Sequence, residues 1–587
     1  MHKLFYITLL IGITFNAYGQ STSPAQFSDI QNKFVNIPDT IQTSIYWYWI
    51  NGNISKEGVV KDLEAMKKVG INRAFIGNIG LDGNPYGKVK MFSDEWWDIL
   101  HTALKTAARL NIQIGIFNGP GWSQSGGPWI KPHQSMRYLT SSQVMVRGPY
   151  NFHKKLTEPQ PNFQDVKALA YAVATGYNLD ISSLKPVLST EPAMDSPDKF
   201  MDNNLSTYIP LTNGKHLILN IDTKTAYTVR SVTINTTNQD VRIEGNLEAK
   251  VNNVYINVKH FVVDRSNSAL NTGFIPFGPA TFSIPATTSS NFRIIFTKVS
   301  SNSGIAEIKL SATPMVENYM EKTLAKMWPT PHPFWEAYQW ASQPAETSKY
   351  IIDPLRVIDV SKYISADGTL NWKVPSGNWI IERTGMVPTN VTNSPAPPEG
   401  RGLEVDKMSK AHVEEHFKAF LGEILKRIPA EDRTTFKVVV EDSYETGGQN
   451  WTDNLIPEFK QTYHYDPVPY LPVLQGRVVG SEDKSDRFLW DLRRLIADDV
   501  SFKYVGGLRE VSHQHGLTTW LENYGHWGFP GEFLQYGGQS DEVGGEFWSE
   551  GDLGDIENRA ASSSAHIYGK TKVSAESFTA GGAPFVR

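Results

Sequence analysis

The chain has 587 residues, more than one compact core usually holds, so we expect more than one domain. Hydrophobic residues make up 40% of the sequence, charged residues 20%, and the formal net charge is −5, so the composition is globular and lacks the basic surplus of nucleic-acid-binding proteins. There is no cysteine, which excludes disulfides, thiolate metal sites and cysteine nucleophiles.

Residues 1–19 have the pattern of a secretory signal peptide. Lys3 precedes an apolar run over residues 4–15, and the small residues Ala17 and Gly19 precede a cleavage site before Gln20. The run is shorter than the about 20 apolar residues that a membrane span needs. We expect secretion across the inner membrane of a bacterium to the periplasm or cell surface, with no membrane span.

Predicted strands and helices alternate in the first part of the mature chain, residues 20–147. Aromatic and β-branched residues predict a strand over 45–50, which ends at the turn Asn51-Gly52, and further strands over 73–77 and 113–117. Between them, Ser55 and Ser93 are expected to cap two helices that each keep their apolar residues on one face. This alternation predicts βαβ units and a parallel sheet.

The pattern changes over residues 148–345, where short alternating runs and frequent turns predict an inserted β-sandwich. The segments 202–207, 292–297 and 304–308 resemble those of discoidin-like carbohydrate-binding modules. A β-rich connector is expected over residues 346–390.

Helix and strand signals alternate again over residues 391–587. Strands are predicted over 436–440, 518–521 and 572–575, and another is expected over 403–406. Helices are predicted from about Ser409 and over roughly 484–515. With three strands before the insertion and four or five after it, we predict a (β/α)8 TIM-type barrel in which the sandwich is inserted.

Polar residues stand where the predicted strands end, which is the active-site edge of such a barrel. They are Asn51, Asn118, Trp122, Glu441, Asp442, Glu522, Asn523 and Glu576. We interpret Glu441 and Glu576 as functional, because solvated charges would not recur at equivalent places. For Asp442 and Glu445 a functional and a structural interpretation stay open.

The segment 522–548 combines five acids with aromatic residues and glycines. Carboxylates supply acid, base or ligand groups, and aromatic rings supply faces on which sugars stack, so we expect a carbohydrate site; a Gly-rich surface loop is the alternative. The sugar-contacting candidates are Trp47, His526, Trp527 and Trp548, in addition to the polar residues at the strand ends. As an isolated histidine, His526 is as compatible with a structural role.

Paired carboxylates in the mouth of a barrel are typical of glycoside hydrolases. One acid protonates the leaving oxygen, and the other acts as nucleophile or as base on water, depending on their separation. The Gly-rich segments lack the Lys-Ser/Thr of a phosphate loop, and no G-x-S-x-G elbow is present.

Six motifs together resemble glycoside hydrolase family 106, the α-L-rhamnosidases. They are YWYWINGNISKEGVVKDLEAMKKVGI, FNGPGWSQSGGPWI, NSPAPPEGRGLEVDKMS, ENYGHWGFPGEF, GGEFW and AESFT. The resemblance implies an inverting exo-hydrolase that depends on Ca²⁺ and removes terminal α-L-rhamnose from a rhamnose-containing oligosaccharide or polysaccharide, such as the side chains of pectin.

The resemblance also implies roles for particular residues. Glu441 is similar to the general acid, and Glu576 and Glu546, with Glu542 nearby, to the base and its neighbours. Asp541 and Glu542 are the expected calcium ligands. Because family members continue beyond the AESFT motif, we expect this chain to be truncated at its C-terminus.

Two alternatives remain open at this point. One is a barrel glycosidase for another sugar, and the other is a non-catalytic carbohydrate-binding surface protein. The catalytic hypothesis requires Glu441, Glu546 and Glu576 to converge on one pocket.

Overall fold

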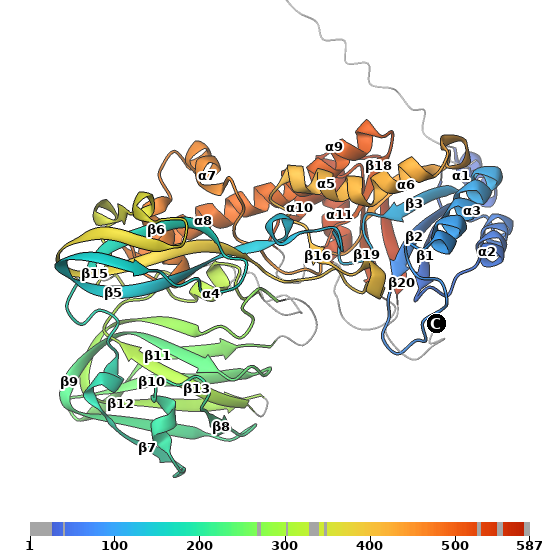
Figure 1. Cartoon of the computed structure of the whole chain (residues 1–587). Helices are drawn as coiled ribbons and strands as arrows, with labels where there is room; N and C mark the ends of the chain where they lie inside the picture. The colour runs from blue at the N-terminus through green and yellow to red at the C-terminus, as the bar shows by residue number, and fades with distance from the viewer. Residues whose placement is uncertain are drawn as a thin grey trace, which may run out of the picture.

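The computed structural model describes most of the chain, and three β-rich parts make up its architecture. The described residues are 26–38, 41–266, 272–300, 303–327, 340–345, 349–524, 530–548 and 556–579. Figure 1 shows a parallel sheet with its helices at one end of the molecule, a four-stranded antiparallel sheet at the other, and a second antiparallel β domain below that sheet. The predicted signal peptide, residues 1–19, lies outside the described residues.

The parallel sheet contains seven strands, which follow one another in the sheet in the order of the chain. They are β1 (Ser44–Ile50), β2 (Arg73–Ile79), β3 (Gln113–Phe117), β17 (Phe436–Glu441), β18 (Thr518–Glu522), β19 (Glu542–Trp548) and β20 (Val573–Thr579). Every neighbouring pair is parallel. The predicted α/β class is therefore confirmed, because six of these strands overlap the strands expected from hydrophobic and β-branched runs.

The helices predicted from capping serines and apolar periodicity are present in the structure. All the described helices are α1 (Phe27–Val35), α2 (Lys56–Lys68), α3 (Asp94–Leu110), α4 (Tyr319–Lys322), α5 (Lys410–Ala419), α6 (Leu421–Arg427), α7 (Leu455–Tyr463), α8 (Glu482–Asp499), α9 (Gly506–Gln514), α10 (Phe533–Gly538) and α11 (Ile556–Ile567). Ser55, Ser93 and Ser409 each accept a hydrogen bond from a backbone N–H in the first turn of α2, α3 and α5. None of the helices in the described part of the chain combines the length and the apolar character needed to cross a membrane.

Side chains alternate between the two faces of the parallel sheet, and helices cover one of these faces. On this helix face, Trp49, Ile76 and Val439 belong to the large core that includes residues of α2 and α3. The opposite face, which we call the inner face, carries a cluster of Tyr46, Tyr48, Phe75, Phe117, Trp122, Val438, Val440 and Trp520. The rings of Tyr46 on β1 and Trp520 on β18 have centroids 6.2 Å apart. Four strand spacings of about 4.8 Å separate β1 from β18 in a flat sheet, so this sheet is strongly curled round its inner face.

The closed eight-stranded barrel is not confirmed. Among the described residues the sheet has seven strands, with β1 and β20 at its edges. The segment expected to form a further barrel strand over 403–406 instead forms β16 (Leu403–Glu404), which pairs antiparallel with β4 (Gly126–Gly127). The backbones of β4 and β16 approach so closely that a Cβ on Gly126 would lie 2.9 Å from the carbonyl oxygen of Leu403. This contact keeps the segment outside the parallel sheet.

The four-stranded sheet joins segments from both sides of the β domain. Its order is β14-β6-β15-β5, formed by β5 (Arg137–Lys155), β6 (Gln164–Val173), β14 (Ile358–Asp359) and β15 (Thr369–Pro388). The connector predicted over 346–390 therefore supplies β14 and β15, which pair with β6 and β5. The boundary predicted between residues 147 and 148 falls inside β5.

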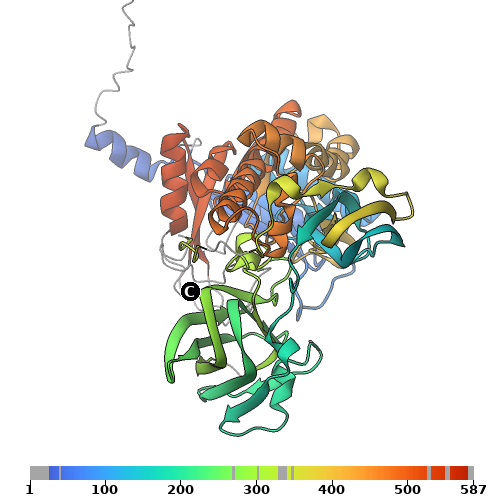
Figure 2. The ribbon, with the colours of Figure 1, turned by 90° about the vertical axis from the view of Figure 1, so that its left-hand side faces the viewer.

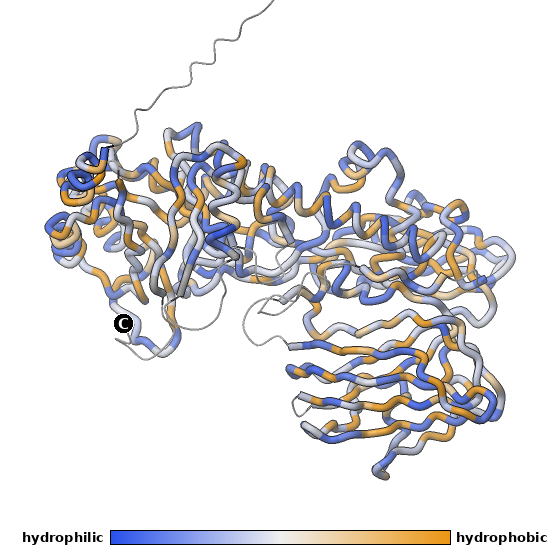
Figure 3. Tube along the Cα trace, turned by 180° about the vertical axis from the view of Figure 1, so that it is seen from behind, coloured by the Kyte–Doolittle hydropathy of each residue, from blue (hydrophilic) through white to orange (hydrophobic). Residues whose placement is uncertain are grey.

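The β domain is formed by seven antiparallel strands in one hydrogen-bonded sheet, so two separate sheets of a sandwich are not confirmed. The strands are β7 (Val187–Glu191), β8 (Ile209–Leu211), β9 (Leu217–Thr236), β10 (Arg242–Val251), β11 (Val254–Asp264), β12 (Ala280–Val299) and β13 (Ser303–Ser311). The register of the long strands β9 and β12 shifts twice, and such bulges bend a sheet so that it can enclose its own core. Hydrophobic and hydrophilic residues alternate along these strands (Figure 3), and the domain projects from the rest of the molecule in a view turned by 90° (Figure 2).

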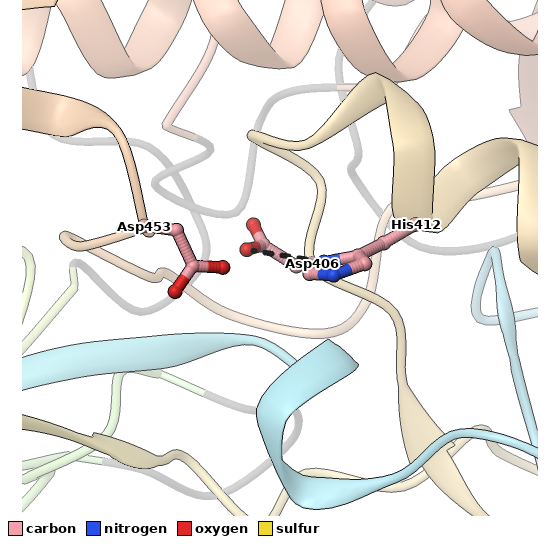
Figure 4. Close-up of side chains that lie close together, drawn as sticks. All are labelled: Asp406, His412 and Asp453. Atoms are coloured by element: carbon pink, nitrogen blue, oxygen red, sulfur yellow. Dashed lines mark ion pairs between the residues drawn. The ribbon is translucent and has the colours of Figure 1, made fainter. Parts of the chain in front are cut away.

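A buried ion pair joins the parallel-sheet part to the four-stranded sheet. Asp406, His412 and Asp453 lie close together (Figure 4), as metal ligands do. Arg137 at the start of β5 donates from Nη2 to Oδ2 of Asp406 and to Oδ2 of Asp453, both at 2.8 Å. Arg137 is 1% exposed and Asp406 is 0% exposed. Because the arginine already neutralises these carboxylates, we interpret the group as a structural junction and not as a metal site.

The junction predicts a particular pH dependence of stability. Burial opposes ionisation of Asp406, but His412, Arg137, Thr452 and Gln449 more than offset it and lower the pKa from 3.8 to about 2. A carboxyl whose pKa is lower in the folded than in the unfolded protein stabilises the folded protein at any pH above its unfolded-state pKa. This contribution is lost as the pH falls from about 4 towards 2. We expect Asp406→Asn to lower the free energy of unfolding by about 2 kcal/mol at pH 7 and by progressively less below pH 4.

Urea unfolding of both proteins between pH 3 and pH 7 measures this difference. The matched control is Asp483→Asn, which removes an exposed ion pair with Arg487 and should change stability little at any pH. A difference between Asp406→Asn and the parent that stays constant down to pH 3 would contradict the assignment.

Candidate active site

Three carboxylates meet on the inner face of the curled sheet. They belong to Asp442, directly after β17, to Glu522, the last residue of β18, and to Glu576 in β20. One oxygen of each lies within 4.8 Å of the others. Side chains of a strand alternate between the two faces of a sheet, so residues two apart point the same way. Val440 and Trp520 are on the inner face, and Asp442 and Glu522, two residues later, therefore point there as well. The three carboxylates come from β17, β18 and β20, and β19 lies between the last two of these strands.

A second acidic group shares Glu522 with the first. Glu546 of β19 and Glu557 of α11 each place an oxygen within 4.8 Å of Glu522 and of each other. Glu546 lies opposite Glu576 in the register of β19 and β20. The first turn of α11 is held here because Asn558 Nδ2 donates to the carbonyl oxygen of Glu546 at 2.8 Å.

Aromatic side chains line the same face and hold two of its acids. The hydroxyl of Tyr46 donates to Oδ1 of Asp442 at 2.9 Å. Tyr48 stacks on Trp122 with ring centroids 5.9 Å apart and an interplanar angle of 29°. The indole N–H of Trp122 donates to Oε2 of Glu445 at 3.2 Å, and the Ser443 hydroxyl donates to Oε1 at 3.1 Å. Glu445 is therefore held at the edge of an aromatic wall.

Burial and mutual repulsion disfavour ionisation of these acids. Burial and the charge of Glu576 raise the pKa of Asp442, and burial and the charge of Asp442 raise the pKa of Glu522. Burial also raises the pKa of Glu576 and of Glu445. Burial, followed by the charge of Glu546, raises the pKa of Glu557 to about 10.

Cationic side chains do not relieve this repulsion within the described part of the chain. No lysine or arginine there forms an ion pair with Asp442, Glu522 or Glu576. Oε1 of Glu522, whose side chain is 1% exposed, has no hydrogen-bond partner among the described residues. The site can hold protons, bind a cation through carboxylate oxygens, or do both.

Glu441 lies on the opposite face from the acid next to it. Val439 belongs to the helix-face core, so Glu441, two residues later, points the same way. It is 0% exposed and lies near Tyr504 and Tyr536, whose pKa is raised first by burial and next by the proximity of Glu441. The expected convergence of Glu441 with Glu546 and Glu576 is therefore not observed, and Asp442 occupies the inner face instead.

Three predicted sugar contacts are internal supports. Trp47 is on the helix face, where its Nε1 donates to Asp62 on α2 at 3.0 Å. Asn51 donates from Nδ2 to the carbonyl oxygens of Leu81 and Asn84, which braces the loop after β2. Asn118 Oδ1 accepts from the Ser125 hydroxyl at 2.5 Å, and Nδ2 donates to the carbonyl oxygens of Gln124 and Val440. Trp47, Asn51 and Asn118 therefore do not belong to either of the two groups of acids.

Asp541 and Glu542 lie at the amino end of β19, away from the acidic groups. Glu542 Oε2 forms an ion pair of 2.6 Å with Arg73, the first residue of β2. Asp541 Oδ2 accepts from the backbone N–H of Thr519 at 2.8 Å. The start of a parallel strand lies at the edge of the sheet opposite its carboxyl end, so these residues cannot share a metal ion with Asp442 and Glu522.

Among the other predicted residues, Trp122, Glu522, Glu546 and Glu576 are at the inner face. Asn523 is fully buried behind it, where a Cβ on Gly537 of α10 would lie 3.0 Å from its Cγ. His526, Trp527 and the side chain of Trp548 lie outside the described residues.

The sequence interpretation missed Tyr46, Tyr48 and Glu557. The alternation Tyr-Trp-Tyr-Trp over 46–49 already indicates that the tyrosines and the tryptophans face opposite sides. No comparable signal marked Glu557, because it lies on a helix and reaches the site only through the packing of α11.

Comparison with known proteins identifies the family of the chain. The family model described as alpha-L-rhamnosidase, of glycoside hydrolase family 106, matches residues 35–587. The structure of a rhamnosidase from Novosphingobium sp. PP1Y is 27% identical, with a TM-score of 0.81 over 95% of this chain and 54% of that chain. A protein of Formosa agariphila named "Putative beta-glucuronidase" is 29% identical over 576 residues, which are 98% of this chain and 37% of that protein. The chain thus spans 54% and 37% of the lengths of these two relatives. Because the family model covers nearly the whole chain, the chain belongs to glycoside hydrolase family 106, the alpha-L-rhamnosidases.

Proposed function

We propose that this chain forms the catalytic part of an exported α-L-rhamnosidase that removes terminal α-L-rhamnose from plant polysaccharide such as pectin. The observation that carries the proposal is the meeting of Asp442, Glu522 and Glu576 beside the stacked Tyr48 and Trp122. Family membership over residues 35–587 supports the same activity. The signal-peptide pattern of residues 1–19 supports export.

The charge of the site favours a neutral sugar over a glucuronide. A glucuronide would bring a further carboxylate to an inner face where oxygens of Asp442, Glu522 and Glu576 already lie within 4.8 Å of one another. Like charges at this separation repel strongly where water is excluded. Rhamnose has a methyl group at the equivalent carbon, and the faces of Tyr48 and Trp122 can contact it without an electrostatic cost. A rhamnoside therefore fits this chemistry better than the substrate named for the Formosa relative.

We assign the general acid to Glu445 and the general base to Glu576. Burial raises the pKa of Glu445, and the indole N–H of Trp122 holds this carboxyl beside the aromatic wall, so it can keep the proton that an acid must donate. Glu576 is partly exposed, so it can reach a water molecule. Glu445 would donate its proton to the glycosidic oxygen as the bond to the anomeric carbon breaks. Glu576 would accept a proton from the water that attacks the opposite side of that carbon, which inverts its configuration.

The donor set also fits a calcium ion. Asp442, Glu522 and Glu576 offer hard oxygen ligands within 4.8 Å of one another, and Oε1 of Glu522 lacks a partner among the described residues. We infer that Asp442 and Glu522 would hold the ion, which leaves Glu576 free to act as the base. When bound, calcium would neutralise the buried negative charge and offer coordination positions to sugar hydroxyls. Glu557 would stay protonated at neutral pH and share a hydrogen with Glu546, which lowers the negative charge next to Glu522.

The curled sheet supports a proposal about the complete fold. The contact of Tyr46 on β1 with Asp442 after β17 spans the interior as it would in a barrel. We propose that the seven strands are the larger part of a (β/α)8 barrel.

The activity can be tested directly on synthetic glycosides. We expect the protein to release rhamnose from an aryl α-L-rhamnoside and not to act on the matching β-D-glucuronide. Glu445→Gln should lower kcat by about 10²- to 10⁴-fold, because a glutamine cannot protonate the leaving oxygen. The loss should be smaller for a nitrophenyl leaving group than for an alkyl one, which needs the proton more.

Glu441→Gln is the matched control. Burial, then the charge of Asp541, raises the pKa of Glu441 well above its usual range, so this carboxyl is already neutral and the amide has nearly its shape. Its kcat should remain close to that of the parent protein. A large loss in Glu441→Gln with normal turnover in Glu445→Gln would reverse the assignment and favour the interpretation from sequence.

The calcium proposal has a readout that does not depend on activity. After treatment with a chelator, added CaCl₂ should raise Tm, with about 2.7 kcal/mol of stabilisation at a hundredfold excess over Kd. Asp442→Asn and Glu522→Gln should reduce this response. Asp541→Asn, at the opposite edge of the sheet, should preserve it. An equal response in all four proteins would exclude the inner face as the binding site.

A further inference from the structure

Gln124 has a backbone conformation that its residue type does not favour. It lies in the loop between β3 and β4, is 5% exposed and has a φ of +92°. This region of φ suits glycine, and a side chain held there costs roughly 1–3 kcal/mol and persists where the surroundings impose it, often at functional sites. Six of the nine residues from Gly119 to Gly127 are glycine or serine, so backbone freedom alone does not explain why a glutamine stands at position 124.

The side chain of Gln124 joins the active-site segment to the helices behind the sheet. Its Nε2 donates to the backbone carbonyl oxygen of Asp442. Its Oε1 accepts from the hydroxyl of Tyr504 at 2.5 Å and from that of Tyr536 at 3.4 Å. The tyrosines can only donate to Oε1, so they orient the amide with its N–H groups toward Asp442.

Tyr504 itself lies in an irregular part of its helix. The six residues Val500–Val505 form a π-helical segment between α8 and α9. Such segments are rare in helices and occur frequently at functional sites. Tyr504 is 0% exposed, its hydroxyl lies 2.6 Å from that of Ser125, and its ring faces the buried Lys407. Two independent departures from regular backbone thus meet at one amide.

We propose that Gln124 is a positioning residue for catalysis, which fixes the backbone of Asp442, and that Tyr504 acts by holding Gln124. The inference rests on the proposed function for its role in the reaction. Asp442 carries one of the three converging carboxylates, and Glu445 follows it by three residues. A shift of this segment therefore displaces the cation ligand and the general acid together, and a displacement of about 1 Å can cost about 10²-fold in rate.

The first test is Gln124→Gly. Glycine adopts a φ of +92° without strain, which offsets part of the stability lost with the hydrogen bonds of the amide, so the variant should remain folded at the assay temperature. It removes the amide, so kcat should fall about 10²-fold while KM changes little, because Tyr48 and Trp122 still contact the sugar. Gln124→Asn, which tolerates this φ but has a shorter side chain, should behave in the same way. A parental kcat in a folded Gln124→Gly would overturn the proposal.

The second test asks whether Tyr504 acts through Gln124. Tyr504→Phe should lower kcat about 10-fold by itself and should lower it no further in the Gln124→Gly background, because residues in one network are not additive. Tyr171→Phe is the matched control. It removes an equally buried hydroxyl, which donates to Glu382 at 2.8 Å in the four-stranded sheet, and it should leave kcat unchanged. Additive losses for Tyr504 and Gln124 would contradict the linkage.

Hydrogen exchange separates failure of this inference from failure of the proposed function. In Gln124→Gly, amides over residues 442–446 should exchange faster, while those of β17 should not change. If the parent protein hydrolyses no rhamnoside, the proposed function fails, and this exchange alone decides whether Gln124 positions the segment. Unchanged exchange over 442–446 would overturn the positioning role whatever the activity.

Discussion

Burying several carboxylates together is the constraint on which the rest of this structure depends. Asp442, Glu522 and Glu576 place oxygens within 4.8 Å of one another, and the side chains of Asp442 and Glu522 are 5% and 1% exposed. Removing such charges from water without a partner is strongly unfavourable. The fold tolerates the arrangement because large apolar cores on both faces of the sheet hold the strands, and because protons or a cation can reduce the charge. Because these carboxylates do not contribute to stability, they indicate a catalytic or ligand-binding role.

The period of two in a strand decides which acids take part. Glu441 and Asp442 are adjacent in the chain, yet Glu441 lies near tyrosines of the helix layer, whereas Asp442 accepts a hydrogen bond from Tyr46 on the inner face. The same rule separates Trp47 and Trp49 from Tyr46 and Tyr48 on β1. Curling then brings side chains of β1 within contact of those of β17 and β18, which a flat sheet would keep far apart. Alternation and curvature together convert a row of strand ends into one site.

The remaining parts of the chain hold this site from behind and from the side. Arg137 at the start of β5 joins the segment around Asp406 to Asp453, which follows the active-site segment in the chain. Gln124 donates to the backbone carbonyl oxygen of Asp442, and Tyr504 in turn donates to Gln124. The four-stranded sheet is built from strands on both sides of the β domain, so that domain is attached through paired strands rather than through a single linker.

The sequence by itself determined six of the seven strands of the parallel sheet and the helices that follow Ser55, Ser93 and Ser409, because apolar periodicity, capping serines and strand-terminating turns are local signals. It also determined the family, since its motifs are spread over both halves of the chain. It predicted Trp122, Glu522, Glu546 and Glu576 at the edge where the structure has them. Only the tertiary structure decided that Asp442 and not Glu441 faces inward, that Glu557 arrives from a helix, and that Asp541 and Glu542 lie at the opposite edge. The face on which a side chain lies, the curvature of the sheet and the packing of the helices depend on contacts between residues far apart in the chain. A local sequence pattern therefore cannot predict them.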